Sequence, residues 1–370
     1  MKQIVSLCFI ILMGLTACRP THKETSDKRS TLRYATLLEM EVCDSFTHVV
    51  VQNAWQHKSP LASYVLVPHQ QKVPQHLPEG LLLRTPLRRA VLHSSVHAAL
   101  LCDLKAENQI AGITDTAYVV SPRLKELFKQ GVAPAGSSIQ PDIEILHQLR
   151  ADAVLVSPFE NSGHGVLDRA GVPLIECADY MEVSPLARAE WMRFYGRLFG
   201  KAETADSLFM VVEKAYNTIK TQIATSGQPR PRVFCDRQTG GVWYQPGGAS
   251  TMGQWINDAG GQYVWEDNKQ SGSLALDLES VYAKAGQADI WLIKYGEPNE
   301  LTYELLAQEK PAYRHFKAWK ERRIFTCNSL YAPFYEEVPF HPERLLANLA
   351  TIFHPNDSTH KGIYYAPMKE

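Results

Sequence analysis

The sequence lacks the short motifs that mark the commonest enzyme active sites. It has no Gly-x-Ser-x-Gly pentapeptide, which excludes the nucleophile turn typical of α/β-hydrolases. It also has no phosphate-binding loop ending in Gly-Lys-Ser/Thr and no Gly-x-Gly-x-x-Gly dinucleotide fingerprint. We therefore expect a protein that is not an enzyme.

Neither sign of charge dominates the composition. The chain has 38 Lys and Arg against 39 Asp and Glu, which gives a formal charge of -1. A nucleic-acid partner, which attracts strongly basic proteins, is therefore not expected. With 45% hydrophobic and 21% charged residues, the composition is typical of a folded globular chain.

No apolar run reaches the length of a membrane-spanning helix, about 20 residues. The run Ile4–Leu15 follows a single lysine and ends at the sequence Leu-Thr-Ala-Cys. This pattern indicates a signal peptide over residues 1–17, and its end resembles the lipobox of bacterial lipoproteins. The resemblance implies cleavage before Cys18, lipid attachment at Cys18 and a periplasm-facing position in the cell envelope. The polar residues 18–30 are predicted to form a flexible tether.

The cysteines are too widely spaced for a disulfide framework or a zinc site. Cys8 lies in the signal peptide, and five cysteines remain in the mature chain besides Cys18. They are odd in number, so at least one is unpaired, and most are expected to be small buried side chains: Cys43, Cys102, Cys177, Cys235 and Cys327. No resident metal or other cofactor is predicted.

Two kinds of pattern follow the tether. Runs of β-type alternation over residues 32–38, 47–51 and 63–67 are separated by turn-forming residues and predict an antiparallel meander. Beyond them, short apolar strands alternate with helical stretches, which favours a parallel sheet covered by helices. A second series of this kind begins at Pro231. The expected fold class is α/β, with two Rossmann-like lobes and the meander on the first.

One amphipathic helix separates the two series. The segment Lys201–Ile223 contains neither Gly nor Pro, and its apolar residues recur at the spacing of one helix face. Such a helix spans the gap stiffly, whereas most two-lobed proteins use strands or loops that bend. The predicted domains are residues 31–200 as the first lobe, 201–224 as a single connecting helix and 225–370 as the second lobe.

Several stretches, in this order, resemble the periplasmic-binding-protein family that serves cobalamin, ferric-siderophore and haem importers. The resemblance runs from about Arg88 to Pro355 and rests on AVLHSSVHAALLCDLKAENQIAGIT, PDIEILHQLRADAVLVSP, AGVPLIECADY, RFYGRLFGKAETADSLF and LDLESVYAKAGQADIWLI. It implies a monomer that binds a metal chelate between its lobes, with the metal entering only inside the chelate. It also implies an ABC permease in the inner membrane as the partner.

Two glutamates occupy matching places in the two lobes. Glu144 stands eight residues before Asp152 and a strand, and Glu279 stands ten before Asp289 and a strand. Both lie in the first turn of a predicted helix, where the helix dipole alone favours a carboxylate. In the resembled family, one glutamate near this position in each lobe pairs with arginines of the permease. The resemblance therefore implies that Glu144 and Glu279 dock the protein on its importer.

The ligand is expected at the carboxyl ends of the strands, where loops of the two lobes face each other. Flat aromatic rings, frequent in these loops, suit a broad and partly apolar chelate, although each ring can also be a core residue. Arg237 adds a cation for an anionic ligand. The predicted contacts are His93, Ser94, Tyr118, Phe159, Glu160, Arg237, Trp243, Tyr244, Tyr295 and Tyr331.

Some alternatives stay open at this point. His93 and His97 are four residues apart, as zinc ligands on a helix are, but His97 leads into an apolar run, which favours a packed or solvated histidine. The stretches directly before Glu144 and Glu279, GSSIQPDI and SGSLALDL, contain no tryptophan where the resembled cobalamin binders place aromatic walls, which favours a ferric chelate or another corrinoid over cobalamin. The alternative functions are an envelope hydrolase on an α/β scaffold and a surface chelate carrier without an importer.

Overall fold

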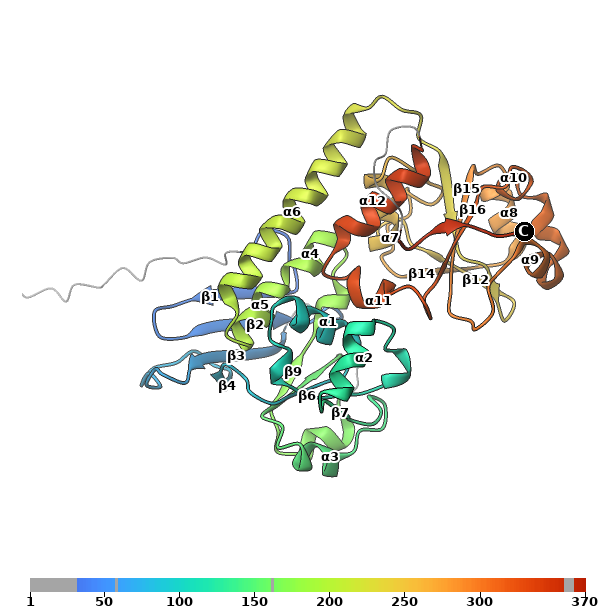
Figure 1. The fold of residues 1–370 in the computed structure, drawn as a ribbon. Helices are drawn as coiled ribbons and strands as arrows, with labels where there is room; N and C mark the ends of the chain where they lie inside the picture. Colours follow the sequence, from blue (N-terminus) through green and yellow to red (C-terminus); the bar gives the residue numbers. More distant parts are fainter. Residues whose placement is uncertain (1–31, 57–58, 161–162, 356–362) are drawn as a thin grey trace, which may run out of the picture.

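The computed structural model describes residues 32–56, 59–160, 163–355 and 363–370. The predicted signal peptide, the tether and Cys18 lie outside these ranges. Within them, no helix is both long enough and apolar enough to cross a membrane. The described chain forms two α/β lobes with an additional sheet on the first lobe (Figure 1), so the predicted fold class is confirmed.

The first lobe is built on a five-stranded parallel sheet with the order β7-β6-β5-β8-β9. Strands β5 and β8 are entirely buried, as expected for parallel strands covered on both faces. The strands are β5 Ala90–Leu92, β6 Ile110–Ile113, β7 Ala133–Pro134, β8 Ala153–Val156 and β9 Leu174–Glu176. The helices include α1 Ser95–Asp103, α2 Pro122–Lys129, α3 Ile143–Gln148, α4 Pro185–Glu190 and α5 Met192–Leu198.

The second lobe has a sheet with the order β13-β10-β15-β16-β17, in which β17 pairs antiparallel and the other strands pair parallel. A smaller antiparallel sheet, β11-β12-β14, lies beside it. The strands are β10 Arg232–Cys235, β11 Gln238–Thr239, β12 Val242–Pro246, β13 Gln262–Tyr263, β14 Ser273–Leu276, β15 Ile290–Tyr295, β16 Ile324–Asn328 and β17 Ala366–Pro367. The helices are α7 Thr251–Asp258, α8 Leu278–Ala285, α9 Tyr303–Glu309, α10 Lys317–Lys320, α11 Phe334–Glu337 and α12 Pro342–Phe353.

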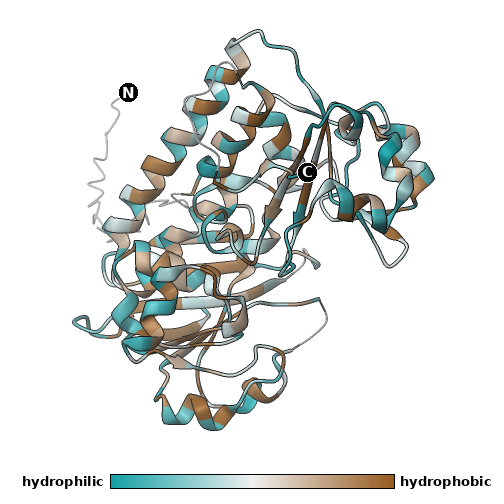
Figure 2. Cartoon of the chain, turned by 45° about the vertical axis from the view of Figure 1, so that its right-hand side comes forward, coloured by the Kyte–Doolittle hydropathy of each residue, from teal (hydrophilic) through white to brown (hydrophobic). Residues whose placement is uncertain are grey.

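The connecting helix α6, Ala202–Thr225, is 24 residues long and forms as predicted. Hydrophilic and hydrophobic residues alternate along it in Figure 2, as expected where one face is covered and the other meets water. It packs on α5 of the first lobe and on α12 of the second, so both lobes hold it. Its buried face consists of residues that predicted the helix: Ala205, Phe209, Val212 and Tyr216.

The sheet ahead of the first lobe differs from the predicted meander. Strands β1 (Leu38–Val42), β2 (Thr47–Gln52) and β3 (Pro60–Pro68) pair antiparallel, as expected. A fourth strand, β4 (Leu81–Thr85), pairs parallel with β3 and does not appear in the sequence prediction. The predicted strand over residues 32–38 is wrong, because β1 begins only at the last of these residues.

Two buried carboxylates explain why this first segment is not a strand. Glu190 is 0% exposed and Glu182 is 2% exposed, and together they accept five successive backbone N–H groups. The donors are Arg33 at 2.9 Å, Tyr34 at 2.7 Å and Ala35 at 2.9 Å to Glu190, and Thr36 and Leu37 at 2.9 Å to Glu182. Buried carboxylates are stable only when hydrogen-bonded, so they hold these amides away from a sheet. We call Glu182, Glu190 and residues 33–37 the N-terminal clamp.

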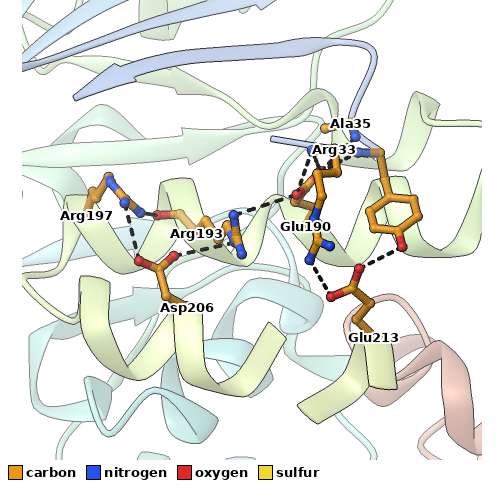
Figure 3. Close-up of polar contacts among 8 residues, drawn as sticks. Arg33, Ala35, Glu190, Arg193, Arg197, Asp206 and Glu213 are labelled. Atoms are coloured by element: carbon orange, nitrogen blue, oxygen red, sulfur yellow. Dashed lines mark hydrogen bonds and ion pairs between the residues drawn. The ribbon is translucent and has the colours of Figure 1, made fainter. Parts of the chain in front are cut away.

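Charged side chains extend the N-terminal clamp to the connecting helix (Figure 3). The guanidinium of Arg33 pairs with Glu213 on α6. Arg193 lies 3.8 Å from Glu190 and 3.4 Å from Asp206, which is also on α6. The N-terminal clamp therefore links the beginning of the described chain to the N-terminal half of the connecting helix.

The two lobes also touch through helix α11, which packs on α1. Glu336 of α11 is 3% exposed and accepts the N–H groups of Val120 (2.8 Å) and Ser121 (2.7 Å) at the start of α2. Ser121 makes no side-chain cap of its own, so a carboxylate from the other lobe caps this helix. His341 adds an ion pair with Asp103 at 3.1 Å. We call Glu336, His341 and these partners the interlobe clasp.

Candidate ligand-binding site

In each lobe the chain first adds strands on one side of the first strand of the sheet and then crosses over to add strands on its other side. The reversal lies between β5 and β8 in the first lobe and between β10 and β15 in the second. Loops that leave such neighbouring strands diverge, and ligands of open α/β sheets bind in the crevice between them. The residues at these places are His93 after β5, Ser157 and Phe159 after β8, Asp236 after β10 and Gly296 after β15.

A cavity of about 690 Å³ lies at the crevice of the first lobe. His93 and Phe159 line it, together with His164 from the loop before β9 and with Ser138 and Ile139 from the loop before α3. Two of the predicted ligand contacts, His93 and Phe159, are thus brought together. The size is typical of a pocket for an organic ligand, about 300–1,000 Å³.

The two histidines of this cavity have opposite electrostatic surroundings. Burial, with a smaller effect of His164, lowers the pKa of His93 to about 4, so its ring is neutral at pH 7. Its Nε2 atom is buried and has no hydrogen-bond partner in the described chain. His164 pairs with Glu176 through Nε2 at 2.8 Å, and this hydrogen bond raises the pKa of His164 against the effect of burial. The surroundings therefore lower the pKa of one imidazole of the cavity and raise the pKa of the other.

A second cavity, of about 710 Å³, lies at the carboxyl ends of β15 and β16. Tyr295 lines it and is 7% exposed, and its hydroxyl accepts the N–H group of Leu301 at 3.0 Å. Tyr331 also lines it, and its hydroxyl donates to the carbonyl of Pro298 at 2.9 Å. The second lobe therefore brings two further predicted contacts, Tyr295 and Tyr331, to one cavity.

Large apolar side chains are exposed on the loops around these crevices. In the first lobe, Tyr118 is 72% exposed, Ile139 88% and Phe159 65%; in the second lobe, Tyr331 is 66% exposed. Exposed apolar surface gathered at one place marks a site that binds a partner or ligand. Apolar side chains are therefore exposed at both cavities, Ile139 and Phe159 at the first and Tyr331 at the second.

Residues 90–331 contain both crevices, and they match the family model described as periplasmic binding protein. The chain belongs to the periplasmic binding protein family. This periplasmic binding protein is therefore a solute-binding protein of the kind that serves ABC transporters, a family of binders rather than of enzymes.

Solved structures and a relative show how far this likeness extends. The periplasmic heme binding protein from Pseudomonas aeruginosa has a TM-score of 0.60 at 17% identity, over 76% of this chain and 98% of its own. The ABC-type Fe3+-hydroxamate transport system from Saccharomonospora viridis DSM 43017 has a TM-score of 0.57 at 17% identity, over 73% and 94%. An uncharacterized lipoprotein of Methanocaldococcus jannaschii is 23% identical and covers 90% of this chain and 85% of its own. At such low identity the two structural matches show the fold alone.

Trp243 of the binding protein is a core residue, so its prediction as a ligand contact is wrong. It is 0% exposed, and its Nε1 donates to the carbonyl of Cys235 at 2.9 Å. Its ring centroid lies 5.6 Å from that of Trp291 and 5.5 Å from that of Tyr313. Tyr244, the next residue of β12, points to the other face and is 52% exposed, as the alternation of a strand requires.

Two more predicted contacts are engaged within the protein. The guanidinium of Arg237 forms ion pairs with Glu297 and Glu309, so an anionic ligand would have to compete with two carboxylates. Ser94 is the N-cap of α1 and accepts a first-turn N–H group at 3.2 Å, as its place before the helix predicts. Glu160 is exposed in the loop after β8.

His97 is packed rather than exposed. It is 5% exposed, and its Nε2 bonds to Asp179 at 2.9 Å. The residues that the structure describes contain no group of three or more His, Cys, Asp or Glu that could hold a metal ion. The five mature cysteines within them form no disulfide, and four are buried: Cys102, Cys177, Cys235 and Cys327.

Glu144 and Glu279 are exposed in the first turns of α3 and α8. Their helices begin alike, because Asp142 and Asp277 are the N-caps and each accepts a first-turn N–H group, at 2.8 and 2.7 Å. Neither glutamate forms an ion pair with any residue that the structure describes. Helices α3 and α8 lie at the outer ends of the two lobes, away from α6 (Figure 1). Permease docking by the two glutamates stays a prediction.

Three residues of the crevices are absent from the predicted contacts. Asp115 and Asp236 follow the buried strands β6 and β10 with φ of 50° and 55°, a left-handed conformation that is uncommon for non-glycine residues and that Asp adopts more readily than most. The carboxylate of Asp115 accepts the N–H and hydroxyl groups of Ser138. His164 is the third. Each of the three is a polar residue in a loop between buried strands. The sequence could therefore have predicted their position near a crevice, but it could not have predicted their conformation.

Proposed function

We propose that this protein is the substrate-binding lipoprotein of an ABC importer and carries a metal chelate, such as a ferric siderophore, a haem or a cobalamin, to the permease. The observation that carries the proposal is the pair of crevices with cavities of about 690 and 710 Å³, one in each lobe, surrounded by exposed rings. Relatives described as binding heme or transporting Fe3+-hydroxamate support this class of cargo. In this proposal the protein acts as a monomer without a cofactor, and the metal arrives inside the chelate.

Binding is tested by titrating the purified mature protein with ferric siderophores, cobalamin and haem and measuring heats of binding. We expect one class to bind below about 1 μM, the range of specific capture. Phe159→Ala and Tyr331→Ala are expected to weaken that binding about tenfold each, because each removes an exposed ring from one of the two cavities. Leu82→Ala, which removes an exposed side chain from the outlying β4, is the control. No binding by any class would exclude the metal-chelate proposal.

Delivery is tested with the double variant Glu144→Ala, Glu279→Ala. We expect unchanged chelate affinity and lost uptake in cells, since both carboxylates are exposed and neither lines a cavity. The matched control is Glu203→Ala, which removes another exposed first-turn glutamate, from α6. Normal uptake by the double variant would refute docking through these two glutamates.

The proposed lipid anchor rests on the sequence ending at Cys18 and is supported by the lipoprotein relative from Methanocaldococcus jannaschii. A Cys18→Ser variant is expected to lose incorporation of labelled fatty acid and to leave the membrane fraction. Retention of the label would place the modification elsewhere.

A further inference from the structure

The edge of the second lobe opposite its cavity carries a local surplus of positive charge. The parallel strands β10, β15 and β16 begin at this edge, whereas the cavity of Tyr295 and Tyr331 lies at their carboxyl ends. The chain as a whole is balanced, with 38 Lys and Arg against 39 Asp and Glu. The segments that lead into these three strands nevertheless contain seven cations: Arg230, Arg232, Lys284, Lys317, Lys320, Arg322 and Arg323. We call these seven residues the basic edge.

Acidic residues neutralise only part of the basic edge. Three of its members form ion pairs, with Glu266, Asp289 and Glu370, at 3.4, 2.6 and 3.1 Å. One of the three, Lys317, also lies 3.9 Å from Glu321. The other four form no ion pair with any residue that the structure describes: Arg232, Lys284, Lys320 and Arg323. The basic edge therefore keeps positive charge that the protein itself does not compensate.

A cavity of about 310 Å³ lies within the basic edge. Arg230, before β10, and Arg323, before β16, line it together with Asp289, which precedes the strand between them. The carboxylate of Asp289 is already engaged, because it pairs with Lys317 at 2.6 Å and accepts the N–H group of Arg232 at 2.7 Å. The guanidinium of an arginine can hold a phosphate group through two parallel hydrogen bonds. The cavity beside Arg323 therefore suits a phosphate group.

The connecting helix joins the basic edge to the place where the described chain begins. Helix α6 ends shortly before Arg230, and its upper end in Figure 1 leads into the second lobe. Arg33, near the start of the described chain, pairs with Glu213 on the same helix. The part of α6 beyond Glu213 rises only about 18 Å, and the chain from Cys18 to Arg33 can span up to about 50 Å. A lipid on Cys18 can therefore hold the basic edge against the membrane surface.

Resting on the lipid anchor of the proposed function, we propose that the basic edge is a contact surface for the anionic phospholipid headgroups of the membrane that holds the anchor. The uncompensated cations pair with headgroup phosphates, and the cavity beside Arg323 takes one of these phosphates. The cavity of Tyr295 and Tyr331 lies at the opposite end of the same strands. While the basic edge rests on the membrane, that cavity therefore faces away from it, toward arriving cargo.

The test measures sedimentation of the mature chain with lipid vesicles, using Cys18→Ser as the parent so that no lipid fixes the protein to a membrane. We expect binding at low salt to vesicles that contain phosphatidylglycerol, no binding to vesicles of phosphatidylcholine alone, and loss of binding at about 0.5 M salt, which screens charges. Each Lys or Arg near an anionic lipid surface strengthens binding about fivefold. The added triple change Lys284→Gln, Lys320→Gln, Arg323→Gln should therefore weaken binding at least about tenfold.

The matched control removes three exposed cations from the first lobe, as Lys72→Gln, Lys125→Gln, Lys129→Gln, and should bind the vesicles as the parent does. Equal binding by the two triple variants would overturn the proposal, because the position of the charges would then not matter. A parent that does not bind the anionic vesicles would overturn it as well. So would tighter binding of the parent to a DNA oligonucleotide than to the vesicles, since the basic edge would then serve another polyanion.

Two further measurements keep these outcomes clear. Circular dichroism checks that each variant is folded, and the single change Lys320→Glu, at an exposed position of α10, gives the same comparison if the triple variant is not. Chelate binding is measured on the same samples. Chelate binding without vesicle binding would count against the membrane contact alone, whereas vesicle binding without chelate binding would count against the proposed function alone.

Discussion

We expect the interlobe clasp to make the stability of the protein dependent on pH. His341 is 6% exposed by its side chain and bonds to Asp103 of the first lobe at 3.1 Å and to Glu343 at 3.2 Å. Burial alone would lower the pKa of His341, but these hydrogen bonds outweigh it and raise the pKa to about 9. An increase from 6.5 to about 9 corresponds to about 3 kcal/mol at 1.36 kcal/mol per pH unit. Because the side chain of Asp103 is 31% exposed, solvent reduces this to about 1–2 kcal/mol.

The direction follows from the raised pKa of His341. A histidine whose pKa is higher in the folded than in the unfolded protein stabilises the folded state. This stabilisation is complete at pH values below the unfolded pKa of 6.5, and it is lost as pH rises through the folded pKa of about 9. We therefore expect His341→Gln, which has no charge at any pH, to be destabilised by about 1–2 kcal/mol near pH 6 and by much less near pH 9.5.

The measurement is urea unfolding of the wild type and of His341→Gln at both pH values, with circular dichroism as the signal. Asp103→Asn should reduce the same pH dependence, and its cost should add only in part to that of His341→Gln, because the two variants share the contact between His341 and Asp103 while Asp103→Asn also loses the ion pair with Arg123 at 2.9 Å. A constant difference between wild type and His341→Gln across this pH range would refute the reasoning.

Outcomes are also expected for four further variants. Glu190→Ala should lower the free energy of unfolding by about 3 kcal/mol, since three amides and Arg193 lose a buried carboxylate; Glu213→Ala should cost about 1 kcal/mol or less in the same urea titration. Glu336→Gln keeps one acceptor oxygen of two, so the two amides it caps should exchange hydrogen faster with solvent. Trp243→Ala should cost about 4 kcal/mol by opening a core cavity, yet bind the chelate normally while folded, which a ligand contact would not.

The connecting helix and the lobes were predictable because their signals are local. The apolar spacing of α6 needs only neighbours three and four residues apart, and its buried residues Phe209 and Val212 lie where that spacing places them. Buried strands followed by polar residues located the crevice of His93 in the same way, since ligands of parallel sheets bind at strand ends.

The failures depend on contacts between distant parts of the chain. Trp243 and Tyr244 are adjacent in β12, and the sequence does not tell which of the two faces points to the core. The charges that pair with Arg237 are 60 and 72 residues away, on Glu297 and Glu309. Residues 32–37 alternate like a strand, but their amides bond to carboxylates about 150 positions later.

The N-terminal clamp lies where tension applied to the N-terminal side of the chain would first act on the described part of the protein. A pull on the chain from its N-terminal side first meets five amides bonded to Glu182 and Glu190, close to α4 and α5. If these bonds act together, tension reaches α4 and α5 before it reaches β5, the strand that precedes His93. With the proposed anchor at Cys18, tension from the membrane attachment would then act on the N-terminal clamp before it acts on the residues that line the cavities.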